Sequence, residues 1–270
     1  MSAKRGLSFK LIPKIIHYCW FGKNPLPPLA VDCINSWKKH CPDYVIKQWN
    51  ESNFDINLTP YTKEAYEAKK WAFVSDVARL YAIYTDGGIY FDTDVEVIKP
   101  LDAFLNTNMF IGFESHKHLA TGLCFGAEKN FYLTKKMLDA YNDLPFLMPN
   151  GKLNTTPCTV YNTIALKEEG FMINNTKQTI NNITVYPTEF FCPKDVKTGI
   201  LTITKNTHCI HHYDASWLSD TQKKEHKILS KYRKKHGTFL GEFLFIIMAF
   251  LTFRRSGIKY VIEKIRSAIA

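Results

Sequence analysis

A helical pattern that ends at two glycines and passes directly into a short apolar strand restricts the fold more than any other part of the sequence. Apolar side chains recur at helical spacing through residues 62–85, and Gly87 and Gly88 then end the helix. A strand predicted at residues 89–91 follows at once. Helices and short strands keep alternating through residues 1–217 with no linker between them. This alternation predicts one α/β domain with a mostly parallel sheet.

The elements on either side of this unit fit the same alternation. We expect further strands at residues 14–20, 44–49 and 208–212, and further helices at residues 29–40, 128–143 and 159–169. Residues 218–270 differ in character, and we expect them to form a C-terminal appendage of basic and apolar helices.

The charge of the chain is concentrated in that appendage. The whole chain carries a net charge of +10, but residues 218–270 hold 12 Lys and Arg against four Asp and Glu, so residues 1–217 are nearly neutral. The apolar run 238–253 contains one charge, Glu242, and is shorter than the ~20 residues that span a bilayer. A buried terminal helix and an interfacial anchor both remain open, and the flanking cations favour the anchor. Aromatic residues are not interleaved with the basic ones, which argues against a nucleic-acid partner.

The cysteines and the N-terminus indicate a reducing compartment. The seven cysteines form no C-x-x-C pair, so we expect reduced thiols rather than a zinc ribbon or a disulfide framework. Lys10, Pro13 and Lys14 interrupt the basic start of the chain, which therefore does not have the apolar run of a signal peptide.

Two carboxylates, Asp92 and Asp94, follow the predicted strand at 89–91, where the alternation of side chains can break. Carboxylate oxygens suit a hard divalent cation such as Mn²⁺ or Mg²⁺, which takes its other ligands from phosphate and water. A D-x-D pair also arises by chance in solvated loops, so its meaning depends on the residues around it.

The helix that precedes this pair carries a second pair of charges. Asp76 and Arg79 are three residues apart and therefore share one face of the helix. On a solvated surface such an ion pair would contribute little, but the helix is apolar around it. Near a metal-bound diphosphate, an acidic and a cationic group suit a sugar hydroxyl and a phosphate oxygen respectively.

Polar and aromatic residues at the ends of the first and the last strand could complete the site. A histidine of the late strand, His211 or His212, could ligate a metal ion as a neutral imidazole. Ser216 and Trp217 offer a hydroxyl and an indole N–H to phosphates. Trp20 ends the first strand, at the edge where open α/β sheets bind ligands. Structural roles in the core are the alternative for the histidines and for Trp20.

Three blocks of the sequence, taken in order, resemble glycosyltransferase family 32, which includes bacterial capsule and O-antigen enzymes and yeast initiating mannosyltransferases. The blocks are IPKIIHYCWFG at 12–22, SDVARLYAIYTDGGIYFDTDV at 75–95 and HHYDASW at 211–217. More distantly, the chain is similar to clostridial glucosylating toxins. The resemblance covers residues 12–217 and implies a glycosyltransferase A-type (Rossmann-like) fold, a nucleotide-sugar donor, a divalent cation and retention of anomeric configuration.

The resemblance also implies a role for each matching residue. Trp20 would stack on the base, Asp76 and Arg79 would hold the donor sugar, Tyr90 would line the nucleoside pocket, Asp92 would bind ribose or sugar hydroxyls, and Ser216 and Trp217 would contact the diphosphate or the glycosidic oxygen. Asp76, Arg79 and Asp92 are the residues expected to be catalytic. Asp94 would ligate Mn²⁺ or Mg²⁺ together with a late-strand histidine, for which we prefer His212. The segment 155–157 matches a T-G-P-like turn of the family only loosely.

Together these observations predict a retaining, metal-dependent hexosyl- or N-acetylhexosaminyltransferase of capsule or O-antigen type. We expect a polyprenyl-diphosphate-linked saccharide acceptor and a peripheral position on the cytoplasmic face of a bacterial membrane, reached through residues 218–270. One alternative is a haloacid-dehalogenase-like phosphatase with Asp92 as its nucleophile, although the chain lacks the Asp-Asp pair that such an enzyme needs downstream. The other is a non-catalytic membrane-surface protein.

Overall fold

The structure, a computed structural model, describes residues 12–214 and 220–252. The chain divides into two compact units, which are described separately. The first comprises Met1–Pro193 and Ile203–His212, and the second comprises Lys194–Thr202 and Tyr213–Ala270. The domain boundary expected at Trp217 lies outside the described residues.

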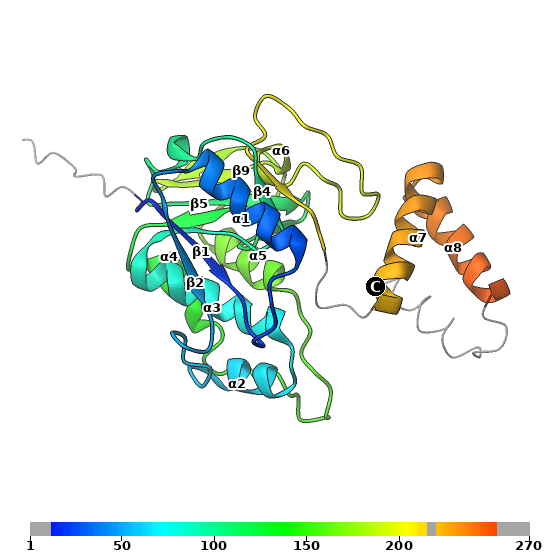
Figure 1. The fold of residues 1–270 in the computed structure, drawn as a ribbon, viewed down its shortest axis with the longest axis horizontal. Coiled ribbons are helices and arrows are strands. Elements are labelled where there is room, and N and C mark those ends of the chain that lie inside the picture. Colours follow the sequence, from blue (N-terminus) through cyan, green and yellow to red (C-terminus); the bar gives the residue numbers. More distant parts are fainter. Residues whose placement is uncertain (1–11, 215–219, 253–270) are drawn as a thin grey trace, which may run out of the picture. The chain divides into compact units, whose positions relative to one another are not determined.

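An eight-stranded sheet forms the centre of the first unit (Figure 1). Its strands follow the order β2-β1-β3-β7-β5-β9-β8, and β6 pairs with β5 beside this path. Strands β4 and β10 form a separate two-stranded sheet. The bounds are β1 Ile15–Cys19, β2 Val45–Trp49, β3 Gly88–Tyr90, β4 Val95–Val97, β5 Met109–Ser115, β6 His118–Ala120, β7 Phe125–Ala127, β8 Gln178–Ile180, β9 Ile183–Tyr186 and β10 Cys209–His211.

Five strands of the large sheet, namely β1, β2, β3, β5 and β9, run in the same direction. The pairs β1–β2, β1–β3 and β5–β9 are parallel, whereas β7 lies antiparallel between β3 and β5. The mostly parallel sheet predicted from the sequence is therefore confirmed in strand direction, with β7 as an inserted antiparallel strand. Because β1, β2 and β3 are parallel, their carboxyl ends meet at one edge, where Trp20 follows β1 and Asp92 comes shortly after β3.

Helices pack against this sheet and complete an α/β domain. The longest helix of the first unit, α3, packs against β1, β3 and β7 through buried residues that include Val77, Leu80 and Ile83. The bounds of the helices are α1 Pro28–His40, α2 Pro60–Glu67, α3 Trp71–Asp86, α4 Tyr132–Asp139, α5 Cys158–Glu168 and α6 Thr188–Phe191, with a 3₁₀ turn at Asp102–Phe104.

The single helix expected over residues 62–85 is wrong, because the structure contains two helices there. Helix α2 begins after Thr59, whose side chain accepts a hydrogen bond from the backbone N–H of Thr62. Lys69 adopts a left-handed conformation with φ of 55°. The N–H of Lys70 then donates to the carbonyl of Ala65, a Schellman-type ending that the apolar periodicity does not reveal.

The glycine turn between α3 and β3 is fixed by a buried histidine. His17 of β1 bonds through Nε2 to the carbonyl oxygen of Gly87 at 2.8 Å, and its Nδ1 accepts from the indole N–H of Trp49 at 3.0 Å. This arrangement requires a neutral imidazole with its proton on Nε2. A side chain at Gly88 would meet Ile15 O at 2.6 Å, so the close approach requires glycine there.

The second unit contains the two C-terminal helices expected from the sequence, α7 (Asp220–His236) and α8 (Thr238–Thr252). Gly237 joins them with a positive φ of 78°. Among the described residues, neither these helices nor any other is both long and apolar enough to cross a membrane.

The neutral state of His17 predicts a pH-dependent stability. Burial lowers the pKa of His17 to about 4, from 6.5 in an unfolded chain. As the pH falls from 6.5 to about 4, the imidazole of residue 17 binds a proton in the unfolded chain but not in the folded one. The free energy of unfolding should therefore decrease by roughly 3 kcal/mol. Urea unfolding of wild type and of His17→Gln, each at pH 7 and near pH 4, would measure this contribution. The decrease in the free energy of unfolding between the two pH values should be larger in wild type by this amount. An identical pH dependence in wild type and variant would contradict it, and His40→Gln is the control.

Candidate active site

The site is organised around the buried guanidinium of Arg79, which is only 4% exposed on α3. Its Nη2 lies 3.1 Å from Asp76 Oδ1 and 2.9 Å from Asp92 Oδ1. The hydroxyl of Tyr90 donates to the same Asp92 oxygen at 3.1 Å, and the guanidinium carbon lies 4.9 Å from the Tyr90 ring centroid. The structure therefore brings together Asp76, Arg79 and Asp92, as the sequence predicted.

The two aspartates of the D-x-D pair lie in a tight turn between β3 and β4. The N–H of Asp92 donates to Gly122 O at 2.9 Å, and the N–H of Val95 donates back to Asp92 O at 3.1 Å. On the other side, the indole N–H of Trp37 in α1 donates to Val95 O at 2.7 Å. The turn is thus held by α1 and by the segment before β7.

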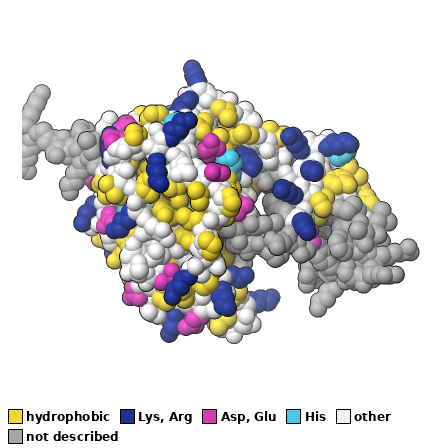
Figure 2. All heavy atoms as spheres, in the orientation of Figure 1, with side chains coloured by type: hydrophobic (Ala, Val, Ile, Leu, Met, Phe, Trp, Pro, Cys, Tyr) yellow, Lys and Arg dark blue, Asp and Glu magenta, His cyan; other side chains and the backbone are white. Residues whose placement is uncertain are grey.

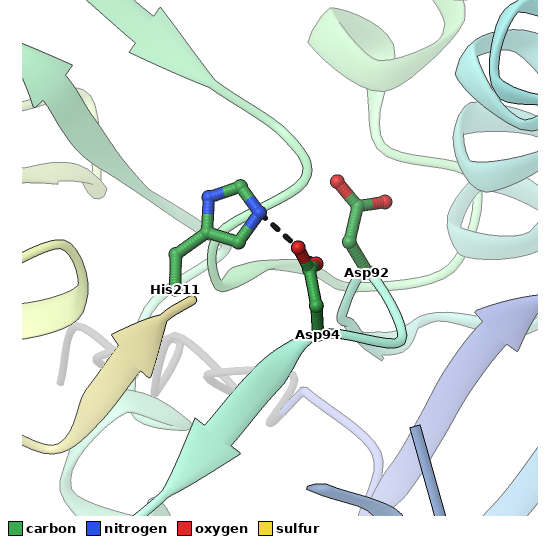
Figure 3. Close-up of side chains that lie close together, drawn as sticks. All are labelled: Asp92, Asp94 and His211. Atoms are coloured by element: carbon green, nitrogen blue, oxygen red, sulfur yellow. Dashed lines mark hydrogen bonds and ion pairs between the residues drawn. The ribbon is translucent and has the colours of Figure 1, made fainter. Parts of the chain in front are cut away.

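Asp92, Asp94 and His211 converge on one point in front of this turn. Figure 3 shows Asp94 directed toward His211, which β10 supplies, with Asp92 beside them. One ligand atom from each lies within 4.8 Å of the others. His211 Nε2 is 3.1 Å from Asp94 Oδ1. These atoms form a candidate metal site built from segments more than a hundred residues apart in sequence.

The histidine in this cluster is His211, whereas the sequence analysis preferred His212. His212 Nε2 instead lies 2.9 Å from Glu96 Oε2. The physical reason is that Asp94 belongs to the turn and not to β4, so the alternation of strand side chains does not apply to it. Glu96 lies within β4, where Ile210 is its partner in the register, and the side chain of His212, just beyond β10, reaches it from the same face of the two-stranded sheet. We therefore revise the candidate ligand to His211.

Burial and neighbouring charges shift the pKa values of the acidic groups. Burial raises the pKa of Asp76 to about 6, although Arg79 beside it opposes the shift. Burial also raises the pKa of Asp92, again against the effect of Arg79. Burial would lower the pKa of His211, but the Asp94 carboxylate raises it well above the ordinary histidine value. A cation bound at His211 would therefore compete with a proton.

The donor set fits a divalent cation. It combines two carboxylates with one imidazole, and the neighbouring side chains add the carboxylate of Asp76 and the guanidinium of Arg79. Once a metal ion has displaced the proton of His211, three carboxylates face one guanidinium, and a dication can neutralise the remaining negative charge. Oxygen and imidazole ligands suit Mn²⁺ and Mg²⁺ better than the soft metals that thiolates select.

Three residues near the site were not found from the sequence. Cys158, the first residue of α5, accepts a hydrogen bond from Arg79 Nη1 at 3.5 Å, and among the seven cysteines it alone is not fully buried. Gly122 lies against Asp92 and Arg79. Glu114, at the end of β5, has its pKa raised by burial and lies within electrostatic reach of His211 and Asp92. No pattern of spacing in the sequence marks any of the three, because long-range packing brings them to the site.

The other predicted site residues are placed less directly. Trp20 lies half-buried at the end of β1, and its indole N–H donates to Asn24 O at 2.6 Å. Tyr90 is fully buried beneath Asp92, so it supports that carboxylate from below. Ser216 and Trp217 lie outside the described residues. The segment 155–157 leads directly into Cys158, through Pro157 as the N-cap of α5.

Comparison with known proteins points to one kind of enzyme. Residues 27–111 match a protein-family model described as a glycosyltransferase sugar-binding region containing a DXD motif. Two curated proteins of Schizosaccharomyces pombe are similar over part of the chain. Inositol phosphoceramide mannosyltransferase 1 is 27% identical over 111 residues, which are 37% of this chain and 33% of that protein. Inositol phosphoceramide mannosyltransferase 3 is 32% identical over 103 residues, 35% of this chain and 28% of that protein. The match thus spans about a third of each relative.

Solved structures of two glycosyltransferases also align with the chain. The PaToxG glycosyltransferase aligns with a TM-score of 0.46 at 19% identity, covering 59% of this chain and 70% of that one. A glycosyltransferase involved in the glycosylation of the major capsid of PBCV-1 aligns with a TM-score of 0.44 at 16% identity, covering 79% of this chain and 98% of that one.

The packing of Gly122 predicts a sharp effect of one methyl group. A Cβ at this position would overlap Asp92 Oδ2 and lie 3.2 Å from Arg79 Nη1. Gly122→Ala should therefore displace Asp92 and lower turnover at least about tenfold, equivalent to about 1.4 kcal/mol or more, while the melting temperature changes by only a few degrees. Gly151→Ala controls for backbone strain without a clash, because Gly151 has φ of 75° and no atom lies within 4 Å of the new Cβ, so its turnover should match that of wild type. Full activity of Gly122→Ala in a steady-state assay would show that Asp92 need not occupy this position.

Proposed function

We propose that this chain is a glycosyltransferase that moves a hexose or N-acetylhexosamine from a nucleotide sugar to a saccharide acceptor with retention of anomeric configuration. Residues 27–111, which match the model of a glycosyltransferase sugar-binding region containing a DXD motif, support this proposal. The observation that carries this proposal is the convergence of Asp92, Asp94 and His211 beside the Asp76–Arg79 pair. This cluster lies where the carboxyl ends of β1 and β3 meet, an edge at which α/β sheets bind ligands.

The metal-binding part of the site serves the leaving group. Asp94 and His211, with Asp92 beside them, would hold Mn²⁺ or Mg²⁺. Such a cation supplies Lewis-acid stabilisation of the negative charge that develops on a departing nucleoside diphosphate. Asp94 Oδ1 lies 3.1 Å from His211 Nε2, so the two groups would bind the same cation.

The remaining side chains orient the donor. Asp76 offers a carboxylate that accepts hydrogen bonds from sugar hydroxyls, and Arg79 offers fixed N–H donors near the sugar and the phosphate. Trp20 provides a half-exposed indole face on which a nucleobase can stack. Ser216 and Trp217 remain the predicted contacts to the diphosphate.

Retention would follow from attack by the acceptor hydroxyl on the face from which the diphosphate departs. The oxocarbenium-like sugar then needs no covalent nucleophile, and the departing phosphate oxygen can accept the proton of the acceptor. Glu114 is the carboxylate to test, because it lies in the electrostatic field of Arg79 and Asp92. A glycosyl adduct trapped on Glu114 during turnover, detected by mass spectrometry, would refute same-face attack.

The acceptor and the setting are also part of the proposal. We infer a lipid-linked saccharide acceptor, such as a polyprenyl-diphosphate-linked one, in capsule- or O-antigen-type synthesis at the cytoplasmic face of a bacterial membrane. The excess of basic residues after Trp217 supports a membrane partner, since juxtamembrane cations are attracted to anionic lipids. The fission-yeast relatives are named for inositol phosphoceramide, a lipid, which supports a lipid-borne acceptor.

The phosphatase alternative finds no support in the arrangement of Asp92. A nucleophilic aspartate needs an oxygen that can reach the phosphorus atom. Asp92 Oδ1 is engaged by Arg79 and Tyr90, and Oδ2 is directed at Gly122. The geometry therefore suits a residue that binds and orients rather than one that attacks.

The proposed activity predicts metal-dependent hydrolysis of a nucleotide sugar in the absence of acceptor. The screen would present UDP-glucose, UDP-galactose, their N-acetyl forms and GDP-mannose, each with Mn²⁺, with Mg²⁺ and with EDTA. We expect one donor to be hydrolysed with a metal ion and none with EDTA, as measured by release of the nucleoside diphosphate. Equal hydrolysis of the preferred donor in EDTA would remove the metal from the mechanism.

Variants of the two neighbouring histidines, His211 and His212, distinguish a loss of metal binding from a general effect on the fold. Asp94→Asn and His211→Ala should each weaken Mn²⁺ binding in a calorimetric titration at least about tenfold and reduce turnover in parallel. His212→Ala is the matched control, because His212 lies with Glu96 and not with the aspartates. Loss of Mn²⁺ affinity in His212→Ala with normal affinity in His211→Ala would reverse the assignment.

A further inference from the structure

Glu114 forms a β-bulge at the carboxyl end of β5. The register between β5 and β6 shifts between Phe113 and Ser115, which makes Glu114 the extra residue of β5. The thiol of Cys192 donates to the carbonyl oxygen of Glu114 at 3.7 Å. A bulge redirects a side chain, and bulges are common beside active sites. Because β5 runs in the same direction as β1 and β3, its carboxyl end lies at the edge of the sheet where Asp92 comes shortly after β3.

Within residues 12–214 and 220–252, no group forms a hydrogen bond or an ion pair with the half-buried carboxylate of Glu114. Several other acidic side chains, by contrast, reach the surface beside Lys or Arg, as Figure 2 shows. Burial disfavours a charged group that has no partner, and it raises the pKa of Glu114. A bound molecule that donates hydrogen bonds to this carboxylate would offset the cost of its burial.

The charged groups that act on Glu114 include residues of the candidate active site. His211 and Arg79 favour the charged form of its carboxylate, and Asp92 opposes it. On β6, His118 favours it as well. The group of possible metal ligands found in the described chain consists of the D-x-D pair and His211, without Glu114. Glu114 therefore lies near the candidate metal site but outside its ligand set, which leaves its carboxylate for an organic ligand.

The proposed same-face attack determines where the acceptor must lie. The metal ion would bind the diphosphate, and the acceptor hydroxyl would approach from the side on which the diphosphate departs. The acceptor would therefore lie on the metal side of the donor sugar. Among the charged neighbours of Glu114, the largest effect comes from His211, a candidate metal ligand. Glu114 thus lies on the side from which the acceptor would approach.

We propose that Glu114 is an acceptor-binding residue, whose carboxylate accepts hydrogen bonds from hydroxyl groups of the acceptor saccharide. Its two oxygens suit a pair of neighbouring sugar hydroxyls, each of which can donate one hydrogen bond. The departing phosphate oxygen still takes the proton of the attacking hydroxyl, so Glu114 orients the acceptor and forms no bond to the donor sugar. The inference rests on the proposed glycosyl transfer and names a residue of its acceptor subsite.

The test compares two fates of the donor, transfer and hydrolysis, in wild type and in Glu114→Gln. The donor is the nucleotide sugar that wild type hydrolyses fastest, and the acceptor probes are octyl glycosides of glucose, galactose, mannose and N-acetylglucosamine. Glu114→Gln keeps the size of the side chain and removes its charge. Because water does not depend on Glu114 for its position, the ratio of transfer to hydrolysis should fall at least about tenfold. The KM for the best glycoside should rise relative to the KM for the donor.

Two further variants distinguish acceptor binding from a structural role. Glu114→Asp keeps the carboxylate and should recover part of the transfer ratio that Glu114→Gln loses. Glu67→Gln, the same chemical change at an exposed residue of α2, should leave the ratio as it is in wild type. Since Glu114→Gln removes a buried charge that lacks a partner in the described chain, its melting temperature should equal or exceed that of wild type.

Four results would overturn the proposal. The first is an unchanged ratio in Glu114→Gln with both rates intact. The second is an equal loss of transfer and hydrolysis, which would place Glu114 with the donor or the metal ion. The third is a glycosyl adduct on Glu114, and the fourth is a wild type that hydrolyses a donor but transfers to none of the glycosides. A wild type that hydrolyses no donor would instead count against the proposed glycosyl transfer itself.

Discussion

The buried guanidinium of Arg79 is the constraint on which the site depends. A buried cation without partners would cost several kcal/mol, so the fold must deliver carboxylates to it. One comes from Asp76 on the same helix, and the other comes from Asp92 beyond the next strand. Only the turn at Gly87 and Gly88 separates α3 from β3, so the conformation of this turn decides whether Asp92 reaches Arg79. The hydrogen bond from His17 to Gly87 and the absence of a side chain at Gly88 fix that conformation.

The pairing with Arg79 gives the two carboxylates of the D-x-D pair different tasks. Asp92 Oδ1 is shared by Arg79 and Tyr90, so Asp92 is fixed in place and partly neutralised. Asp94 Oδ1, in contrast, lies 3.1 Å from His211 Nε2. Under the proposed function, a cation at this point would meet Asp92 already oriented by Arg79 and Tyr90, and it would bind Asp94 together with His211. This difference would let one short motif serve both the sugar and the metal ion.

Local signals in the sequence predicted much of the fold. The helix before Gly87, the strand after it and the i, i+3 pair of Asp76 and Arg79 depend on residues close together in the chain, and the structure contains all of them. The break near Lys69 was missed because a Schellman ending leaves the apolar period almost intact. Cys158 and Gly122 were missed for another reason. Their proximity to Arg79 arises from long-range packing, which no pattern of spacing encodes.

The choice between His211 and His212 shows where such reasoning reaches its limit. Side-chain alternation decides which residues of a strand share a face, but it applies only to residues inside the strand. Glu96 is inside β4 and pairs with His212, whereas Asp94 is in the turn and is directed to the other histidine. Asp92 and Asp94 converge because they lie in a turn. Residues of a turn do not follow the side-chain alternation of a strand, so this alternation cannot identify the ligands of the candidate metal site. Ligands in such turns must be assigned from the structure.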